Sequence, residues 1–464
     1  MTWNARITKE QEQDIAAVTA AKADILNTRS LLGVAGTYNP GDPFVNRAQS
    51  RYNAGNLVSR ISFDATAKLT NASGVTVSLD SENTLHAADM PGVSLKFAKT
   101  TEGTSAEARH TLAAPINVNH GVMVLRFYLH LGAGVTAADN LSYVELRLYD
   151  HTHGIDTAFC SIFKIWVTAN TATVDANGVS GWYCIPVCLD CPTSTGAAAA
   201  TLTEIEFIKI TIASSGADTP AKTANIPVIT LDAIEFYTSP FAAAWYSIRI
   251  DTSIGTGALT VAEALKDLSV KATIGIAPEL IGASGNLTLA NLTTIQGWGH
   301  QLALYSGDYP TWTAWSSKTE ALKRNYLPTA AAWCLANGLP VSLARTVFAS
   351  GGTGFIPHDR LLFQEARIKQ FGGLNGSYAI ATGELETAFR PEVMHTGYFI
   401  DVVTGGTTPG AVTALIALAP TAKLGISLGS HVATANQRAT LLSCVADLQT
   451  AAIANKTWAD LLVL

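Results

Sequence analysis

Hydrophobic and polar residues follow three successive patterns along this chain. In residues 4–30, apolar residues recur at three- and four-residue steps, which predicts an amphipathic helix. The stripe is narrow, like a coiled-coil seam of about three heptads. Such a helix can pair with copies of itself, dock on a larger assembly or lie on the next domain. The residues that define it are Ile15, Val18, Ala21 or Lys22, and Ile25, with Thr8 and Gln11 in capping-box position.

The pattern changes to short strands between about residues 55 and 240. Runs of β-branched and aromatic residues alternate with clusters of Gly, Asn, Asp and Thr, and no long helical period intervenes. This pattern predicts an antiparallel β-sandwich. The clearest runs are 121–129, 142–149, 163–167, 205–212 and 228–236.

From Trp245 onward, strands alternate with helices. Strands are expected at 246–251, 271–276 and 301–305, with helices at 261–268 and 288–297 between them. Such alternation predicts a parallel sheet, most simply a barrel whose site lies at the strand C-terminal ends. The alternation continues through 318–337, 339–348, 359–371, 424–428 and 437–455.

These patterns divide the chain into three parts. Residues 1–50 form a helical leader with a turn-rich connector at 33–43, residues 51–240 form the β-sandwich, and residues 241–464 form the β/α barrel. The predicted fold class is therefore multidomain: an N-terminal helix, an antiparallel jelly-roll sandwich and a distorted β/α barrel.

Composition and charge narrow the function classes. Charged residues make up 14% of the 464 residues, against roughly 25% in an average soluble protein. This sparsely charged chain, rich in Ala, Thr and Gly, suits an extracellular or particle-borne β-rich protein. The net charge of −6 gives no basic face for nucleic acid or an anionic membrane. The start of the chain lacks the apolar region of a secretory signal, and no window resembles a membrane span. We therefore expect the protein to fold in a cytosol, without membrane insertion.

Three of the six cysteines form a C-x3-C-x2-C cluster at Cys184, Cys188 and Cys191. With Asp150, His151 and His153 upstream, the cluster could form a zinc site. Alternatively, the cysteines are small apolar residues at alternating strand positions, which is the commoner role of a buried thiol.

The strand-rich segment resembles the jelly-roll carbohydrate-binding modules. The resemblance lies in the Leu-Asp-x-Ile-x-Phe phrase at 231–236 and the Gly-Trp-Tyr phrase at 181–183. It implies sugar binding through exposed aromatic rings. The sequence leaves open which of the strand aromatics face outward: Tyr143, Tyr149, Trp166 and Trp182.

The last segment resembles the polysaccharide (NodB-like) deacetylase family. Five phrases follow the family's order, although no single phrase is specific. They lie at 249–253, 264–276, 299–309, 347–352 and 426–461. The resemblance implies a distorted β/α barrel that removes acetyl groups from glycans.

The residues that the resemblance assigns to chemistry are degenerate. Family members bind a divalent metal with one Asp and two His, and a second Asp serves as general base. In this sequence Asp251 keeps the base position, but the ligand Asp becomes Thr252 and the two ligand histidines become Tyr305 and Tyr309. Neutral hydroxyls are poor replacements for carboxylate and imidazole. The late His falls on Gly429, two residues before His431.

Two features of the barrel mouth remain open. A rearranged site could use Asp251, Asp308 and His300. The commoner roles of these residues are a structural His300, a polar turn at Asp308 and a buried, hydrogen-bonded Asp251. Nothing in the spacing of His358, Asp359 and His395 marks them as ligands. Four aromatic residues follow a strand end and could stack on pyranose rings or pack beneath a loop. These are Tyr305, Tyr309, Trp312 and Trp315.

Together, these parts look like a bacteriophage virion appendage. We expect a non-catalytic tail fibre, spike or decoration protein, assembled in the host cytoplasm, with neither metal nor cofactor. Its expected partners are its own copies, as a homotrimer through the N-terminal helix, other virion proteins and a host surface polysaccharide. The alternative is an active metal-dependent deacetylase that acts on that glycan.

Overall fold

The computed structural model describes the chain in sixteen segments between residues 56 and 461. The predicted helix over 4–30 lies outside them. The segments are 56–73, 75–80, 94–99, 106–130, 143–164, 181–192, 194–213, 228–239, 241–251, 256–306, 319–339, 346–349, 370–375, 392–396, 398–399 and 406–461.

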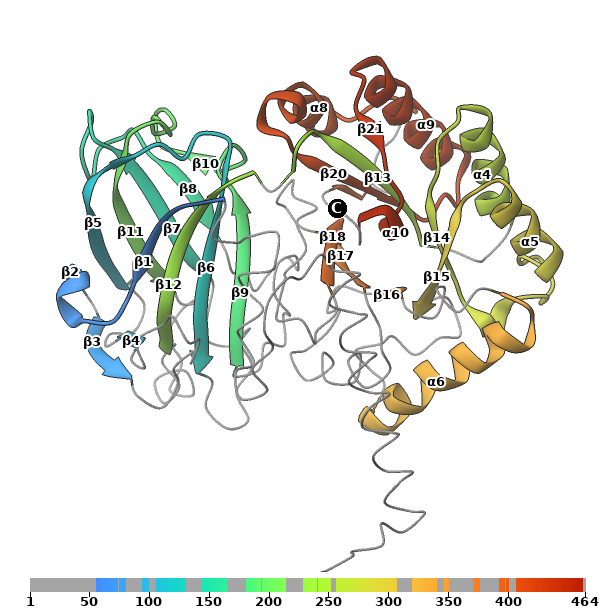
Figure 1. The fold of residues 1–464 in the computed structure, drawn as a ribbon, viewed down its shortest axis with the longest axis horizontal. Coiled ribbons are helices and arrows are strands. Elements are labelled where there is room, and N and C mark those ends of the chain that lie inside the picture. Colours follow the sequence, from blue (N-terminus) through green and yellow to red (C-terminus); the bar gives the residue numbers. More distant parts are fainter. Residues whose placement is uncertain are drawn as a thin grey trace, which may run out of the picture.

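Two antiparallel six-stranded sheets form a sandwich in the first half of the described chain (Figure 1). The first sheet has the order β3 (Val75–Asp80), β4 (Ser94–Lys99), β12 (Val228–Thr238), β6 (Gly121–His130) and β9 (Gly181–Cys188), with β1 (Leu57–Ser62) also paired to β12. The second sheet has the order β10 (Ser194–Thr195), β8 (Ser161–Lys164), β7 (Tyr143–Asp150), β11 (Ile205–Ala213), β5 (Ala106–Ile116) and β2 (Thr70–Ser73). The expected antiparallel strands are therefore present.

Alternation along each strand sets the two faces of the sandwich. In β7, Leu146 and Leu148 are fully buried and point into the core between the sheets. Phe127 of β6 and Ile210 of β11 join the same core from the two sheets. Successive strand side chains point to opposite faces, so every second residue is apolar. Tyr149 is also buried, with 2% of its surface exposed, and therefore offers no open ring for a ligand.

The outer face of the first sheet carries a buried ion pair. Arg126 on β6 contacts Oε2 of Glu235 on β12 through Nε at 2.9 Å and Nη2 at 2.7 Å. The Tyr237 hydroxyl donates to the same oxygen at 2.8 Å, and Arg60 lies 3.3 Å from Oε1. Burial alone would raise the pKa of Glu235, but the two arginines and Tyr237 lower it overall.

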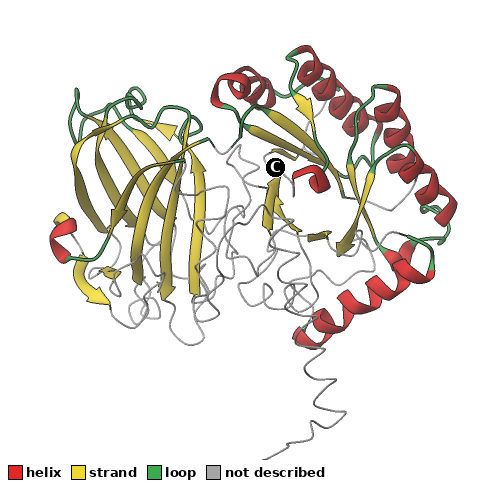
Figure 2. Ribbon diagram, viewed as in Figure 1, coloured by secondary structure: helices red, strands yellow, loops and turns green. Residues whose placement is uncertain are grey.

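The second half of the chain forms a unit of one nine-stranded parallel sheet and helices, here named the α/β unit (Figure 2). Its strands follow the order β18 (Glu392–Thr396), β17 (Gln370–Asn375), β16 (Thr346–Ala349), β15 (Gln301–Ser306), β14 (Thr273–Ile276), β13 (Trp245–Ile250), β20 (Gly425–Ser430) and β19 (Tyr398–Phe399), with β21 (Ala454–Asn455) paired to β13. The helices are α4 (Gly257–Asp267), α5 (Leu289–Gly297), α6 (Glu320–Ala336), α8 (Gly410–Ala422), α9 (Ala435–Thr450) and α10 (Trp458–Leu461). Two short 3-10 helices are η2 (Thr66–Lys68) and η3 (Pro278–Leu280).

Strand β13 separates two environments in this unit. Its even-numbered side chains, such as Ile248 and Ile250, pack with the apolar sides of helices, including Leu265 of α4 and Val445 of α9. Its odd-numbered side chains, such as Trp245, point to the other side of the sheet. There Trp245 packs with Trp458 of α10, so this short helix fills the space that the curved sheet surrounds (Figure 1).

The element boundaries differ from the predictions at some ends. Helix α5 begins after Thr288, whose side chain forms the capping box, as its sequence predicts. The helix predicted over 437–455 ends at Thr450, because the chain turns at Ala452, where φ is 54°. Residues 454–455 instead add β21 to the sheet. The strand predicted within 339–348 is described as β16 from Thr346 onward. The last two residues of the predicted segment 359–371 belong to strand β17.

The sandwich and the α/β unit are packed together. Cys188, at the end of β9, belongs to the same apolar cluster as Tyr246 and Ile248 of β13, and Cys191 packs against that cluster. Ser239 donates a hydrogen bond to the Lys423 carbonyl at 3.0 Å. None of the helices in the described part of the chain is long and apolar enough to cross a bilayer.

Candidate functional site

The candidate site begins at Asp251, which directly follows β13. Its backbone N–H donates to the Ser430 carbonyl at 3.0 Å, and this bond ties it to the end of β20. Only 3% of Asp251 is exposed. The structure therefore places the predicted base at the carboxyl end of a central strand, where parallel-sheet sites are commonly built.

The carboxylate of Asp251 is held by Arg249, two residues earlier on the same strand. Arg249 Nε donates to Oδ1 and Nη2 donates to Oδ2, so the guanidinium grips both oxygens. Residues two apart on a strand point to the same face, which brings the two charges together. Arg249 is itself buried, with 2% exposed. The pair therefore neutralises two buried charges with a bidentate geometry.

Apolar and polar side chains surround this pair on the inner side of the sheet. The Arg249 guanidinium carbon lies 5.9 Å from the ring centroid of Trp458, which is a cation–π contact. The Trp458 backbone N–H donates to the Thr273 hydroxyl at 3.1 Å. Beyond the pair, Ser247 donates to Ser427 at 3.1 Å across β13 and β20. The interior is therefore filled by its own side chains around the ion pair.

The structure brings one of the four predicted aromatic site residues next to this interior. Tyr305, near the end of β15, is 6% exposed and clusters with Trp245, Ala303 and Trp458. Its burial leaves little ring surface for a sugar, so a role in binding stays a prediction. Tyr309, Trp312 and Trp315 lie outside the described residues, as do Thr252 and Asp308.

His300 is a structural residue. Its Nδ1 accepts from the Ala272 N–H at 3.1 Å, and its Nε2 donates to the Ala262 carbonyl at 2.9 Å. Burial lowers the pKa of His300, so the neutral ring is favoured. Both ring nitrogens are used, which leaves none for a metal. The proposed rearranged site of Asp251, Asp308 and His300 therefore loses His300, and Asp308 lies outside the described residues.

Among the residues that the structure describes, no group of three or more His, Cys, Asp or Glu side chains could hold a metal ion. Of the three positions that the resemblance assigns to metal ligands, the described residues include only Tyr305, and a tyrosine hydroxyl is a poor replacement for imidazole. Gly429, the position of the late histidine, has no side chain, and His358 and Asp359 lie outside the described residues.

The extended backbone of β9 keeps two of the three clustered cysteines far apart. Cys184 and Cys188 are four residues apart on this strand, and at about 3.3 Å per residue their backbones are roughly 13 Å apart. That spacing is too long for both thiolates to bind one zinc ion, where Zn–S distances are about 2.3 Å. The zinc interpretation of the three cysteines is therefore wrong for this fold.

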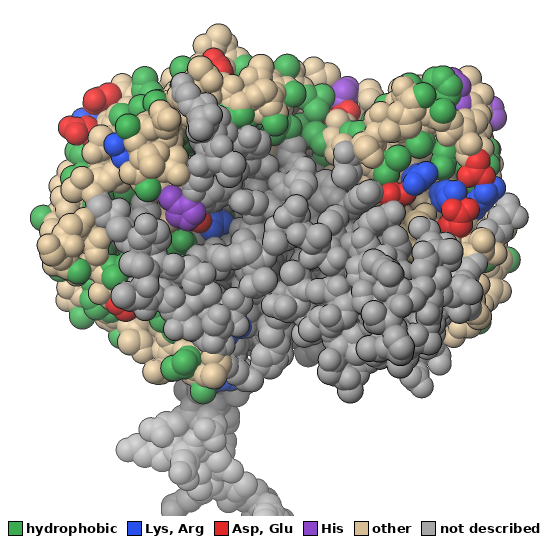
Figure 3. All heavy atoms as spheres, turned by 180° about the vertical axis from the view of Figure 1, so that it is seen from behind, with side chains coloured by type: hydrophobic (Ala, Val, Ile, Leu, Met, Phe, Trp, Pro, Cys, Tyr) green, Lys and Arg blue, Asp and Glu red, His purple; other side chains and the backbone are tan. Residues whose placement is uncertain are grey.

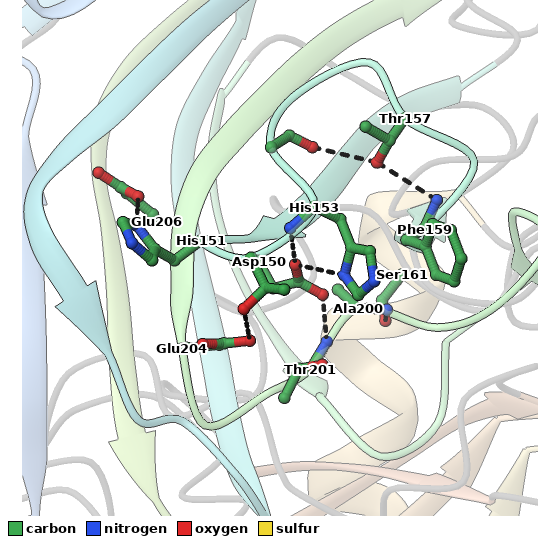
Figure 4. A network of polar contacts seen from close by, with 12 residues as sticks. Asp150, His151, His153, Thr157, Phe159, Ser161, Ala200, Thr201, Glu204 and Glu206 are labelled. Carbon is green, nitrogen blue, oxygen red and sulfur yellow. Dashed lines mark hydrogen bonds and ion pairs between the residues drawn. The ribbon is translucent and has the colours of Figure 1, made fainter.

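The residues upstream of the cysteines form a polar network in the loop after β7 (Figure 4). Asp150 is fully buried and accepts from the His153 N–H, the His153 ring and the Thr201 N–H, each at 2.8 Å. Burial would raise the pKa of Asp150, but these bonds lower it overall. His151 contacts Glu206 at 2.5 Å. Each histidine thus has a carboxylate partner, and the network ties the loop to β11 and its preceding turn.

The same loop presents an aromatic pair that the sequence did not single out. Phe159 is 37% exposed, and its ring stacks on that of His153 with centroids 4.0 Å apart and an interplanar angle of 12° (Figure 4). Nearby, Asp156 pairs with Arg109 and with Lys209. Lys209 also contacts Glu107 at 2.7 Å. Figure 3 shows acidic and basic side chains gathered on the sandwich. No local sequence signal marks Phe159, because its exposure depends on the loop.

Comparisons with known proteins give low similarity only. No protein-family model and no curated protein matches the sequence. Among solved structures, the chain is similar to a family 4 carbohydrate esterase from Bacillus anthracis, with 13% identity and a TM-score of 0.31 over 47% of this chain and 81% of that chain. It is similar to the enzymatically active domain of tailspike protein 4 of Bacteriophage CBA120, with 15% identity and a TM-score of 0.23 over 40% of this chain and 22% of that chain. A family 11 carbohydrate-binding module from Clostridium thermocellum is similar over 38% of this chain and 94% of that chain, with 10% identity and a TM-score of 0.23. At such values the function has to be argued from the residues themselves.

Proposed function

We propose that this protein is a non-catalytic, glycan-binding component of a bacteriophage virion: a tail fibre, spike or decoration protein. In this proposal the sandwich is a jelly roll, and the α/β unit is a distorted β/α barrel of the deacetylase type that serves as a scaffold.

The Arg249–Asp251 pair is the observation that carries the proposal. A general base must reach the proton it removes at about 2.6–3.2 Å and must have a free lone pair there. Asp251 is 3% exposed, and both of its oxygens accept from Arg249. Both oxygens are thus engaged as partners of a buried guanidinium. The remaining candidate ligand, His300, is also committed to backbone atoms.

One exposed aromatic residue in the described part of the chain supports glycan binding. Aromatic rings stack on sugars at wet recognition sites because they offer apolar faces with polar edges. Phe159 is the one aromatic among the large apolar side chains exposed in the described residues. We place the main binding surface at Tyr309, Trp312 and Trp315, which follow β15 in the sequence.

The virion assignment rests on the sequence. A helical leader, a β-sandwich and a deacetylase-like segment with degenerate ligand positions are the combination that suggests an appendage protein. In this proposal the Ile15, Val18 and Ile25 stripe joins three copies, and other virion proteins hold the trimer on the particle.

Binding to an array of bacterial surface polysaccharides tests the glycan-binding part. We expect the wild-type chain to bind an acetylated polysaccharide and the Trp312→Ala/Trp315→Ala variant to lose that binding at least tenfold. Trp298→Ala is the matched control, because Trp298 caps α5 and contacts Lys266 on the helical side. Retained binding in the double variant, or no binding by the wild type to any polysaccharide, would contradict the proposed surface.

One observation favours the alternative, an active metal-dependent deacetylase. Asp251 occupies the carboxyl end of β13, where the family resemblance expects the base. An enzyme would have to release Asp251 from Arg249 and recruit ligands from residues such as Tyr309. Metal-dependent release of acetate from an acetylated glycan distinguishes an active deacetylase from a non-catalytic binding protein.

A further inference from the structure

The turn between Cys188 and Cys191 lies outside the site at Asp251, and its proposed role does not depend on glycan binding. Strand β9 ends at Cys188, and the chain then turns back, with the Cys191 N–H donating to the Cys188 carbonyl at 3.3 Å. This i to i+3 bond defines a β-turn, in which the end Cα atoms are less than about 7 Å apart. A disulfide usually needs Cα atoms at about 4.4–6.8 Å. The turn therefore holds the two cysteines within bonding range.

The side chains of this turn also face each other. The Cys191 thiol is a hydrogen-bonding neighbour of the Cys188 thiol. Cys188 is 1% exposed, whereas Cys191 is partly exposed. Neither is paired in a disulfide in this structure. The partly exposed Cys191 thiol can therefore react with an external reagent, while the buried Cys188 thiol lies beside it.

The turn is anchored on both sides. The Leu189 N–H donates to the Gly121 carbonyl at 3.0 Å, and both oxygens of Asp190 lie 3.2 Å from the His120 ring. Cys188 belongs to the apolar core of the α/β unit, and Cys191 packs on that core. The turn thus lies where the sandwich meets the α/β unit.

We propose that Cys188 and Cys191 form a reversible disulfide when the protein leaves a reducing cytosol, and that this bond fixes the turn at the contact between the sandwich and the α/β unit.

The oxidant is a small-molecule disulfide such as oxidised glutathione. The Cys191 thiolate attacks one sulfur of the oxidant and releases one thiol. Cys188 then attacks the sulfur of Cys191 and releases the second thiol. Two protein thiols become one disulfide, and their protons end on the two released thiols.

The other cysteines are poorly placed for this bond. Cys184 lies about 13 Å from Cys188 along the extended strand, beyond disulfide range. Cys160, Cys334 and Cys444 are buried. Burial raises the pKa of Cys334 and of Cys444 to about 11. The pKa of Cys188 is raised as well, by its contact with Cys191 and by burial, so the partly exposed Cys191 is the thiol that reacts first.

Alkylation of the full chain tests the proposal. The protein is incubated with reduced or oxidised glutathione, unfolded, and labelled with N-ethylmaleimide. We expect wild type and Cys184→Ser each to lose two labelled cysteines after oxidation. Cys188→Ser should lose one, because Cys191 then stays joined to glutathione, and Cys191→Ser should lose none. A wild-type chain that keeps all six cysteines labelled would overturn the proposal, as would a loss of two labels in Cys191→Ser.

Peptide mapping of the wild type gives the same test without any variant. Cleavage at Lys164 and Lys209 and before Asp175 and Asp190 separates residues 175–189 from 190–209. We expect these two peptides to remain joined after oxidation, with Cys184 carrying the label. If Cys188 carries the label and Cys184 does not, the bond lies elsewhere and the proposal fails.

Discussion

At the scale of single residues, the partner of Asp251 determines what this site can do. A carboxylate at a strand end can act as a base, bind a metal or serve as a structural anion. The bidentate contact from Arg249 and the low exposure of both side chains favour the structural role. Buried ion pairs contribute little net stability as pairs, but breaking one leaves a charge without compensation.

Arg249→Met should therefore destabilise the protein strongly. It leaves the Asp251 carboxylate buried and unpaired, and we expect a cost of about 3–5 kcal/mol in the free energy of unfolding. Replacing both residues, as Arg249→Met/Asp251→Leu, should recover most of that loss. Urea unfolding of the wild type, the two single variants Arg249→Met and Asp251→Leu, and the double variant gives the coupling energy. Additive losses in the double variant would show that the two side chains do not act as a pair.

At the scale of elements, alternation along the strands determines which side chains meet. The sequence predicts β13 and its neighbours well, because short runs rich in apolar and β-branched residues alternate there with helical segments. It also predicts the N-terminus of α5 from Thr288. It does not predict β21, because Ala454 and Asn455 are too short a run, and this strand is held by tertiary contacts. One such contact is the pair of hydrogen bonds between the Asn455 amide and the Lys271 backbone, at 2.7 and 3.1 Å.

Contacts between residues far apart in the sequence also explain which features of the site the sequence did not predict. Arg249 and Asp251 have the spacing of same-face strand residues, so their pairing was available from the sequence. The position of Trp458 beside them was not, because more than 200 residues separate it from β13. The structural role of His300 depends likewise on the backbone of α4 and of Ala272, directly before β14.

The Glu235 cluster on β12 predicts a pH-dependent stability. The folded-state pKa of Glu235 lies below its ordinary value of 4.5. Its stabilising effect is therefore present above about pH 4.5 and is lost as the pH falls through the folded-state pKa. Glu235→Gln should cost about 3 kcal/mol at pH 7, because Arg126 stays buried, and should flatten the acid limb of the stability profile.

A matched control for Glu235→Gln lies on the other sheet. Glu107 pairs with Lys209 but is 28% exposed, so Glu107→Gln should cost only about 0–1 kcal/mol. Unfolding by urea at several pH values compares the two. Equal losses in both variants would contradict the importance of burial in the Glu235 cluster.

At the scale of the whole molecule, the proposal describes a rigid pair of glycan-handling folds carried by an oligomer-forming leader. The described units share an apolar cluster at Cys188, so they form one packed body rather than separate modules. The leader lies outside the described residues, and its trimer stays a prediction from the Ile15, Val18 and Ile25 stripe.

Charges in that stripe should dissociate the assembly. We expect Ile15→Asp/Val18→Asp to convert a trimer to a monomer, because like charges would meet in the seam. Gln13→Asp/Ala20→Asp adds the same charge on the outer side of the predicted helix and should leave the trimer intact. Light scattering coupled to size-exclusion chromatography measures both masses. A monomeric wild type, or a trimer that survives the first change, would contradict the role of the leader.

The most direct test of the central claim is acetate release from an acetylated glycan. The purified full chain is incubated with acetylated chito-oligosaccharide and acetylated xylan, with Zn²⁺, Co²⁺, Ni²⁺ or Mn²⁺ added in turn, and free acetate is measured. We predict that no metal raises release above that of Asp251→Asn or of the protein-free blank. Metal-dependent acetate release by the wild type that is lost in Asp251→Asn would show that Asp251 acts as a base and that the protein is an enzyme.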